Sequence, residues 1–552
     1  MNLKKKIHLY FWTLRFLKIE QILYRIKYLF SNVSRIKVIR RPVILPSWTW
    51  SSPLFFIRCY DGEGTFNLLN KKIKFNGPIG WNDDSIEKLW LYNLHYFDDL
   101  NAIDSNKRID AHHLLVKNWI ENNPLSEGGI GWEPYPLSIR LVNLIKWCSR
   151  LKISDDEILE SIYTQAQVLS KTLEYHILGN HLFSNAKALM FAGHFFESEV
   201  GEVFINQANT LFERELTEQF LDDGGQFELS PMYTAMAVFD ILDLIKIGRI
   251  TSRNENSMLN KKLCFIAQKG LFWLQVMSHP DEDISFFNDS SKGIAPKMSY
   301  LLAYASTLGV FPSQKIDTQT LTTLKSSGYS RISIGDSVLL FDHANIGPDY
   351  LPGHSHADNL SIEWSMDEQR VLVNSGTSLY GVSSERHRQR KTSSHNTVEV
   401  DGFDSSEIWS GFRVARRAYS SLESAQSDSN SVSISASHDG YQRLSGRVTH
   451  TRYIDVTNSD VKITDKLDGR WREAYGFFHF HPDIIVKQLN LRHISLLLPS
   501  GLKILMETSG TISIQATTWH PEFGVAIDNT KCIVAFESNL LRTKFSCVRT
   551  SN

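Results

Sequence analysis

Three histidines in the second half of the chain stand beside amide and carboxylate residues, a combination typical of a metal site or a catalytic site. Two of them, His354 and His356, lie in the segment PGHSHADN, and His395 lies in the later segment SHNT. In extended backbone His354 and His356 point to the same side, and a hairpin after them can return Asn374 toward the pair. Two or three histidines with a carboxylate suit zinc, but Asn374 is a poorer zinc ligand than aspartate. A metal site and a simple hydrogen-bonded histidine network both fit this pattern.

A second group of polar residues opens a helical segment at 179–193. Apolar residues form one face of that segment, while Asn180, Ser184 and Lys187 share another. Polar side chains grouped at a helix start, after a glycine, can line a cleft. The simpler interpretation is that Asn180 caps the helix and that His181 is an ordinary, satisfied histidine.

A third group lies in the polar, glycine-containing segment 222–233, which leads into another helix. Ser230 is placed to cap that helix, and Pro231 is placed at its first position. Tyr233 then falls in the first turn, where the partial positive charge of a helix can lower the pKa of a phenol. A lowered pKa is what a tyrosine needs to act as a general base near neutral pH. The alternative is ordinary capping, with a tyrosine that only packs.

Weaker signals come from aromatic, amide, carboxylate and arginine residues outside these three groups. Such residues are typical of a sugar-binding cleft, because the arginine fork matches the carboxylate of a uronic acid. The candidate substrate-binding residues are Asn93, Tyr96, Trp132, Glu133, Tyr135, Arg388 and Arg390. The alternative is that the aromatic residues pack between helices and that the arginines lie on a solvated face.

The segments that must position these residues change character once along the chain. From about residue 84 to 324, apolar residues recur at helical spacing, which predicts a long array of paired helices. After Gly328, short alternating segments with Asp-Gly turns predict antiparallel strands in a sandwich. A polar, Ser/Thr-rich stretch at 309–328 predicts the linker. We therefore expect an N-terminal basic and aromatic segment at 1–84, a helical domain at 85–325 and a β-sandwich domain at 326–552.

The composition excludes several classes of protein. Lys+Arg 59 against Asp+Glu 60 gives a net charge of -1, so no global charge favours nucleic acid as a partner. Five widely spaced cysteines without a C-x-x-C pair indicate neither a disulfide framework nor a thiolate zinc site. No apolar run is long enough to predict a membrane span.

Residues 1–30 combine basic side chains with aromatic and aliphatic ones. Their apolar run is broken by His8 and Arg15 and lacks a small-residue cleavage site, so we expect no secretory signal. This favours a cytoplasmic protein, with the periplasm as the alternative. Apolar residues interspersed with basic ones can form a membrane-surface helix, which would give peripheral membrane contact. The simpler interpretation is a basic amphipathic helix docked on its own protein.

Six segments resemble the heparinase II/III-like polysaccharide lyases and their relatives among the alginate lyases. They occur in the order expected for that family and span roughly residues 85–410. The segments are WEPYPLSIRLVNLIKW (132–147), GNHLFSNAKALMFAG (179–193), DGGQFELSPMY (223–233), PGHSHADNLSIEW (352–364), VLVNSGTSLYG (371–381) and SSHNTVEVDGFDSSEIW (393–409). The GHSHAD block followed by SHNTV is quite specific, whereas the first 80 residues and the region beyond 485 contribute little.

The resemblance implies an α+β multidomain fold, with an N-terminal (α/α) helical toroid followed by a C-terminal antiparallel β-sandwich and a cleft between them. It also implies β-elimination on an acidic polysaccharide that contains uronic acid. In that reaction the C5 proton beside a carboxylate is abstracted, and the 4-linked sugar leaves. The enzyme must neutralise the carboxylate, remove the proton and protonate the leaving oxygen. Because no export signal is expected, a role in assembling or modifying a surface polysaccharide is a reasonable hypothesis.

The resemblance also implies roles for four candidate catalytic residues. Asn180 and His181 resemble the pair that neutralises the carboxylate. Tyr233 resembles the base, which can also serve as the acid. His354 resembles a catalytic histidine on the sandwich side, either an alternative base or a group that stabilises the enolate.

The remaining histidines fall at what resembles a structural metal site. His356, Asn374 and His395 occupy its ligand positions, and the implied cofactor is zinc or another divalent metal. Asn374 stands where an aspartate is usual, which is a departure from the family pattern. Ser184 stands where some members have glutamate and Gln226 where many have histidine, so heparin specificity does not transfer.

Two other functions are compatible with this fold. A uronate C5 epimerase abstracts the same proton but returns one to the opposite face instead of expelling the leaving group. A glycan-binding or assembly protein without catalysis would keep the fold alone.

Overall fold

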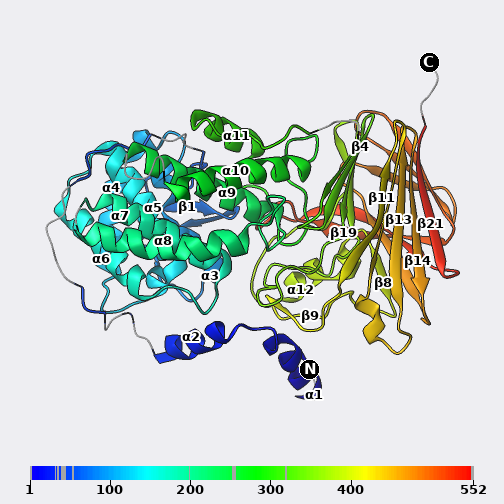
Figure 1. The fold of residues 1–552 in the computed structure, drawn as a ribbon, viewed down its shortest axis with the longest axis horizontal. Helices are drawn as coiled ribbons and strands as arrows, with labels where there is room; N and C mark the ends of the chain where they lie inside the picture. The colour runs from blue at the N-terminus through cyan, green and yellow to red at the C-terminus, as the bar shows by residue number, and fades with distance from the viewer. Residues whose placement is uncertain are drawn as a thin grey trace.

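The computed structural model describes residues 3–30, 33, 36–38, 45–51, 55–197, 199–251, 257–316 and 320–548. Helices fill one half of the molecule and antiparallel sheets fill the other (Figure 1). The predicted fold class, a helical toroid followed by an antiparallel β-sandwich, is confirmed.

The helical domain packs its helices around one core that holds the fully buried Trp147 and Trp273. Its helices are α3 (Lys88–Tyr96), α4 (Ile109–Asn122), α5 (Pro134–Leu151), α6 (Asp156–Lys171), α7 (Gly179–Phe195), α8 (Glu199–Gln219), α9 (Pro231–Ile250), α10 (Met258–Val276) and α11 (Met298–Thr307). Helix α7 contacts both α5 and α8, and α9 contacts α10. The apolar residues that recur at helical spacing thus face this core, as the sequence predicts.

A β-hairpin that the sequence analysis did not predict precedes these helices. Its strands β1 (Thr65–Leu68) and β2 (Lys71–Lys74) pair across a turn at Leu69 and Asn70, whose φ angles are 53° and 59°. Positive φ at both central residues is typical of the tight hairpin turns that match strand twist. Asn70 Nδ2 donates to Glu522 Oε2 at 2.8 Å, so the hairpin tip reaches the sandwich domain.

The sandwich has two layers, and the outer one is an eight-stranded antiparallel sheet. In spatial order its strands are β11 (Ser420–Ser427), β12 (Ser431–His438), β13 (Thr449–Thr457), β14 (Asp460–Asp468), β21 (Leu540–Val548), β18 (Lys503–Thr508), β17 (His493–Leu497) and β16 (Ile485–Gln488). Its alternating apolar residues, such as Ile434 and Ile454, point into the sandwich core.

Two smaller antiparallel sheets form the inner layer, and an isolated bridge between Leu372 and Phe480 joins them. One contains β3 (Leu321–Leu324), β4 (Tyr329–Ile334), β5 (Ser337–Asp342), β6 (Ile362–Met366) and β7 (Gln369–Leu372). The other contains β19 (Thr511–Trp519), β20 (Ile527–Ala535), β15 (Ala474–His479) and β8 (Val398–Val400). Strand β3 begins before residue 326, where the sequence placed the domain boundary.

Strand β5 lies at the interface between the two domains. Leu339 and Phe341 belong to the sandwich core, whereas Leu340 between them belongs to the core of the helical domain. Because neighbouring residues of a strand point to opposite faces, one face of this sheet packs on each domain. The loops of the inner layer therefore lie next to the helical domain.

Helices α1 (Leu3–Leu14) and α2 (Ile19–Phe30) lie along the lower edge of both domains in Figure 1. Helix α1 contacts the short strand pair β9 (Ile408–Trp409) and β10 (Arg413–Val414), close to α12 (Ser384–Arg390). Helix α1 thus contacts the rest of the protein, as the simpler interpretation expected of this segment. Among the described helices, none combines the length and the apolar character needed to cross a bilayer.

Candidate active site

Helix α7 starts at the domain interface in a strained turn. Leu178 has φ 70° and ψ -156°, a conformation that almost only glycine adopts, and Gly179 follows with φ 57°. A non-glycine residue in this region costs about 1–3 kcal/mol, and such residues cluster at functional sites. A Cβ on Gly179 would lie 2.4 Å from Leu351 Cδ2 and 3.3 Å from Glu228 Oε1. The turn therefore presents Asn180 and His181 beside the sandwich domain.

Helix α9 starts at the same interface, with the predicted cap in place. Ser230 Oγ accepts a hydrogen bond from Tyr233 N at 3.2 Å, and Pro231 is the first helical residue. Ser230 Oγ also donates to Asp289 O at 2.7 Å, which ties the helix start to the loop after α10. Tyr233 is thereby fixed against His354 of the sandwich, with ring centroids 4.1 Å apart.

Asp289, which the sequence analysis did not single out, organises the histidine cluster. Its Oδ2 lies 2.9 Å from Nδ1 of His354, and its Oδ1 lies 2.8 Å from Nε2 of His356. The guanidinium of Arg386 binds both carboxylate oxygens. Burial opposes ionisation of this carboxyl, but Arg386 and the two imidazoles outweigh burial and hold the pKa of Asp289 well below its usual range. The shared contact confirms that His354 and His356 point to one side.

The contact with Asp289 sets the tautomer of His354. An ionised carboxylate accepts the proton on Nδ1, so the lone pair of the neutral ring lies on Nε2. Glu228 Oε2 is 3.7 Å from that Nε2, which is too far for a hydrogen bond. The side chain of His354 is 13 % exposed, so part of the ring remains open to a ligand.

The expectation of a lowered pKa for Tyr233 is wrong. Burial of the phenol raises its pKa well above the usual value, and the neighbouring Tyr380 and Asp289 raise it further. The hydroxyl groups of Tyr233 and Tyr380 are hydrogen-bonded at 2.9 Å. These effects outweigh the helix start, because its influence is worth only about 0.3–2 kcal/mol. Tyr233 therefore stays protonated at neutral pH and suits a proton donor better than a base.

Glu174 favours the protonated form of His181, the residue that follows Asn180 in helix α7. Its Nδ1 lies 3.1 Å from Glu174 Oε1, and its ring stacks on Tyr135 at 4.2 Å. Burial alone would lower the pKa of His181, but the charge and hydrogen bond of Glu174 raise it above the usual value. Asn180 is half-buried, and within the described residues its side-chain amide forms no hydrogen bond. A cationic imidazole and a free amide at one helix start can bind a carboxylate.

Replacing Glu174 with glutamine tests this reading of His181. In the parent protein, affinity for a uronate should fall as the pH rises through the raised pKa of His181, because the imidazolium is lost. Without the carboxylate that pKa falls, so in the variant the loss of affinity should begin at lower pH. At pH 7 we expect KM for an acidic polymer to rise about tenfold, with a smaller effect on kcat. Identical pH profiles of KM in the two proteins would contradict the assignment.

Two of the candidate substrate-binding residues are corrected by the structure. Trp132 is buried in the helical core, where its Nε1 donates to Asn123 O at 3.0 Å. Arg390 is fully buried, and its Nε and Nη2 donate to Ser355 O at 3.0 and 2.8 Å. Both side chains support the framework rather than face a ligand.

The other candidates lie in several places. Tyr96 packs edge-on against Tyr135 at 6.2 Å, next to His181. Glu133 accepts from Lys88 Nζ at 2.9 Å and from the hydroxyl of Tyr92. Asn93 Nδ2 donates to Leu89 O within its own helix, at 2.9 Å. Arg388 is held by Glu385 and by Thr518 of β19.

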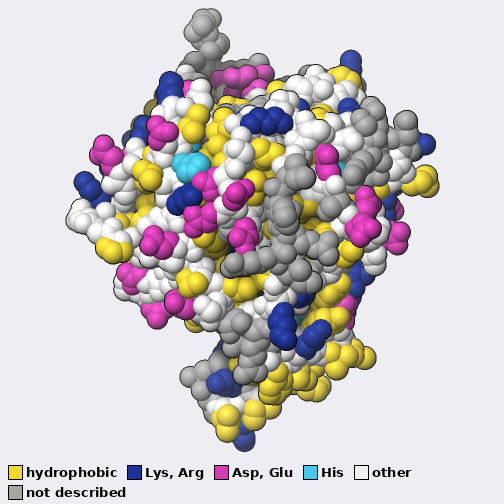
Figure 2. Space-filling view, turned by 90° about the vertical axis from the view of Figure 1, so that its left-hand side faces the viewer, with side chains coloured by type: hydrophobic (Ala, Val, Ile, Leu, Met, Phe, Trp, Pro, Cys, Tyr) yellow, Lys and Arg dark blue, Asp and Glu magenta, His cyan; other side chains and the backbone are white. Residues whose placement is uncertain are grey.

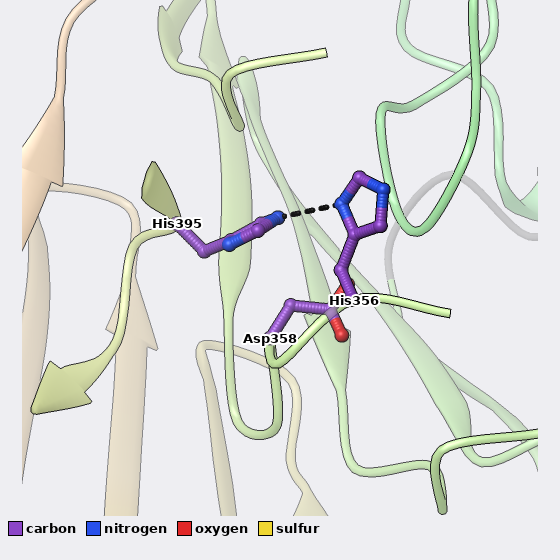
Figure 3. Close-up of side chains that lie close together, drawn as sticks. All are labelled: His356, Asp358 and His395. Atoms are coloured by element: carbon purple, nitrogen blue, oxygen red, sulfur yellow. Dashed lines mark hydrogen bonds between the residues drawn. The ribbon is translucent and has the colours of Figure 1, made fainter. Parts of the chain in front are cut away.

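A compact group of side chains that could hold a metal ion lies next to His354, to which Asp289 links it. Nδ1 of His356 and Nε2 of His395 are 3.0 Å apart, and ligand atoms of His356, His395 and Asp358 lie within 4.8 Å of one another. Figure 3 shows the two imidazoles turned toward each other beside Asp358. The third member of this group is Asp358. The side chain of the predicted ligand Asn374 is engaged elsewhere, because its Oδ1 accepts from Ser361 Oγ at 2.7 Å.

The donor set of this group fits a divalent metal. The ring nitrogen of His356 that faces away from His395 is bound by Asp289, and Nδ1 of His395 lies 2.7 Å from Lys391 O. Metal-binding histidines typically bind a carboxylate or a carbonyl through their second nitrogen in this way. Two imidazoles and one carboxylate suit zinc. The residues present are therefore adequate for the metal that the resemblance implies.

Curated relatives match part of the chain. A heparin-sulfate lyase of Bacteroides stercoris is 26% identical over 247 residues, which cover 41% of this chain and 36% of the relative. A heparin-sulfate lyase of Pedobacter heparinus is 25% identical over 316 residues, which cover 51% of this chain and 47% of the relative. The chain thus matches less than half the length of these relatives.

Solved structures and family models extend the match to most of the chain. A crystal structure of heparinase III has a TM-score of 0.73 at 17% identity, covering 93% of this chain and 88% of that one. Chondroitin AC lyase of Streptomyces coelicolor A3 has a TM-score of 0.53 at 6% identity, covering 83% and 74%. These likenesses show a shared fold. The model described as Heparinase II/III N-terminus matches residues 69–317, and the one described as Heparinase II/III-like, C-terminal matches residues 317–545. The chain belongs to the heparinase II/III-like family.

Proposed function

We propose that the protein is a polysaccharide lyase that cleaves a uronic-acid-containing polysaccharide by β-elimination. The observation that carries this proposal is the contact of His354 with Tyr233 across the domain interface, with ring centroids 4.1 Å apart. One side chain presents a nitrogen that can accept a proton, and the other presents a hydroxyl that can donate one. β-Elimination needs both groups at one sugar. Family membership and relatives named heparin-sulfate lyase support the same reaction.

The proposed reaction begins with the uronate carboxylate bound by Asn180 and protonated His181. Binding makes the C5 proton more acidic, because the two groups stabilise the negative charge that moves onto the carboxylate in the enolate. Nε2 of His354 removes the proton. The bond from C4 to the linking oxygen then breaks, and the phenol of Tyr233 protonates that oxygen. The products are an unsaturated uronate and a chain end with a free hydroxyl group.

Incubation with a panel of uronate polymers tests the reaction. We expect ultraviolet absorbance from the new C4–C5 double bond, together with shorter chains. No signal on any acidic glycan would contradict lyase activity. In heavy water, deuterium at C5 without chain shortening would indicate the epimerase instead. Glycan affinity without turnover would indicate a binding protein.

We further propose that His356, Asp358 and His395 hold a structural divalent metal, zinc by ligand type. When bound, the metal would fix the wall that carries His354, and the proton transfers would remain with the side chains described above. The fully buried positions of His356 and His395 support this structural role.

Chelation tests the metal proposal. We expect the purified protein to contain about one equivalent of zinc, and a chelator to lower the midpoint of thermal unfolding by several degrees, because metal binding contributes to folding. A His395→Ala variant should hold no metal and should not respond to the chelator. Protein that contains no metal and whose midpoint is unchanged by added zinc would contradict the proposal.

We propose a cytoplasmic location and a role in the assembly or modification of a surface polysaccharide. All five cysteines are free, as is usual for proteins of reducing compartments. Fractionation of cells tests the location, and recovery with a periplasmic marker would contradict it. Peripheral membrane contact through residues 1–30 is a separate proposal, because it does not depend on the chemistry of the site.

A further inference from the structure

Helices α1 and α2 carry a stripe of large apolar side chains that points away from the protein. These side chains recur every three or four residues, so they form one continuous face on each helix. They are between 43 and 83 % exposed and comprise Leu3, Ile7, Phe11, Leu14, Ile19, Ile22, Leu23, Ile26, Leu29 and Phe30. Ten of the 28 large apolar side chains exposed in the described residues thus lie in this segment. A concentration of this kind marks an interaction surface.

The opposite faces of both helices are the ones that dock on the protein. On α1, Thr13 Oγ1 donates to Val414 O at 3.2 Å. On α2, the buried Gln21 donates to Ile177 O and Tyr350 O at 3.4 Å, and Tyr24 packs on Tyr175 at 4.6 Å. A surface helix normally turns its apolar stripe inward and its polar face outward. Helix α2 instead turns its apolar stripe outward, so the described part of the chain leaves that stripe uncovered.

The charge around the stripe is almost entirely positive. Residues Lys4, Lys5, Lys6, Arg25 and Lys27 are exposed on the two helices. Their one acidic residue, Glu20, is paired with Arg214 at 3.0 Å. Figure 2 shows hydrophobic and basic side chains together on the protruding lower end of the molecule. Aliphatic and aromatic residues flanked by lysine and arginine match the acyl chains and anionic headgroups of a lipid surface.

We propose that α1 and α2 dock the protein on an anionic membrane surface, with the apolar stripe inserted among the lipids and the basic residues on the headgroups. A second copy of the chain fits the surface less well. A two-fold dimer through the same face would bring the basic residues of one copy close to the basic residues of the other. Like charges at such an interface oppose association, whereas anionic lipids neutralise them.

Docking would also orient the active site toward the bilayer. Tyr28 of α2 stacks on His176 at 4.3 Å, and His176 lies three residues before Gly179 of the active site. Helix α2 contacts the helical domain and α1 contacts the sandwich, so both walls of the site would be held near the surface. If the proposed lyase function is correct, on which this step rests, the substrate is an acidic glycan attached to a membrane. Membrane binding itself needs no catalysis.

Sedimentation with lipid vesicles tests the docking. The full chain should co-sediment with vesicles that contain phosphatidylglycerol, more weakly with pure phosphatidylcholine, and less at high salt. Replacing both Phe11→Ser and Leu23→Ser should weaken binding at least about tenfold, because two apolar side chains leave the lipid phase. The triple variant Lys4→Gln, Lys5→Gln, Lys6→Gln should weaken binding to anionic vesicles about a hundredfold.

Phe311→Ser is the matched control. Phe311 is 59 % exposed and Phe11 is 63 % exposed, but Phe311 lies in the helical domain after α11. The control should bind vesicles like the parent, and all variants should keep the parent's melting temperature and its rate on soluble polymer. No binding of the parent to anionic vesicles would overturn the proposal. Loss of a parent dimer in the Phe11→Ser, Leu23→Ser variant, without vesicle binding by the parent, would assign the face to self-association instead.

Discussion

Replacing Tyr233 with phenylalanine should lower kcat on a uronate polymer by about 10²–10⁴-fold, the range that a positioned acid or base contributes. The change removes only the hydroxyl that is hydrogen-bonded to Tyr380 at 2.9 Å. The ring that packs on His354 remains, so the fold and the affinity for substrate should change little. Initial rates from ultraviolet absorbance and a thermal melt measure the two effects separately.

Tyr380→Phe is the control for this variant. It removes the other hydroxyl of the same hydrogen bond and keeps the ring, which packs on Phe523 at 5.0 Å in the parent protein. Tyr380 positions Tyr233 rather than transferring the proton. Removal of the Tyr380 hydroxyl should therefore lower kcat much less, by about tenfold or below. Equal losses in the two variants would contradict the assignment of Tyr233 as the donor.

Replacing Asp289 with asparagine should damage both catalysis and stability. The amide can no longer fix Nδ1 of His354 as the protonated nitrogen. In enzymes with a comparable histidine–aspartate pair, the same substitution lowers kcat by about 10⁴-fold. The variant also leaves Arg386 buried without its carboxylate partner, because Asp289 binds both ends of the guanidinium. Breaking one side of a buried ion pair costs about 3–5 kcal/mol of unfolding free energy. Kinetics and urea unfolding of one preparation measure both losses.

Asp281→Asn is the matched control, because Asp281 also accepts from an arginine, Arg370 Nε at 2.7 Å, but contacts neither catalytic histidine. Asp281 is partly exposed but its partner Arg370 is buried, so we expect a loss of stability smaller than that of Asp289→Asn and a normal rate. The pH dependence provides a further check. The depressed pKa of Asp289 means that its contribution to stability is present above the unfolded pKa and is lost only as the pH falls through the lower folded value. A variant that keeps parental activity would contradict the role given to Asp289.

The sequence predicted those features that local patterns determine. Helical and strand periodicity separated the two domains, and the Ser230-Pro231 pair identified the start of α9. The alternation of His354, Ser355 and His356 placed both histidines on one side, where both contact Asp289. Each of these signals lies within a few residues, so one sequence is enough to find it.

Features that depend on distant residues were missed or wrong. Asp289 lies in a loop without periodicity, and its partners His354 and Arg386 are 65 and 97 residues away. Only the folded chain reveals that contact, although the polar run Asn288 to Ser291 before Gly293 was a signal of a loop. The pKa of Tyr233 was predicted from its helix start, but burial between the two domains determines its direction.

The group of His356, Asp358 and His395 also depends on contacts between residues that are distant in the sequence. Asn374 was expected as a ligand because the resemblance places a residue there, yet its oxygen is bound by Ser361 and the backbone of Asn396. Asp358 follows His356 by two residues and is the last residue of the GHSHAD block, so the sequence contained this candidate.

We assign His354 as the base and Tyr233 as the acid. A substrate whose leaving group needs no proton tests this assignment most directly. A uronate with an aryl ether of low pKa at C4 serves this purpose, because its phenolate leaves unaided. We predict that Tyr233→Phe recovers to within about tenfold of the parent rate on this substrate, whereas His354→Gln stays at least about 10²-fold slower. Recovery of His354→Gln while Tyr233→Phe remains inactive would reverse the two roles and contradict the account.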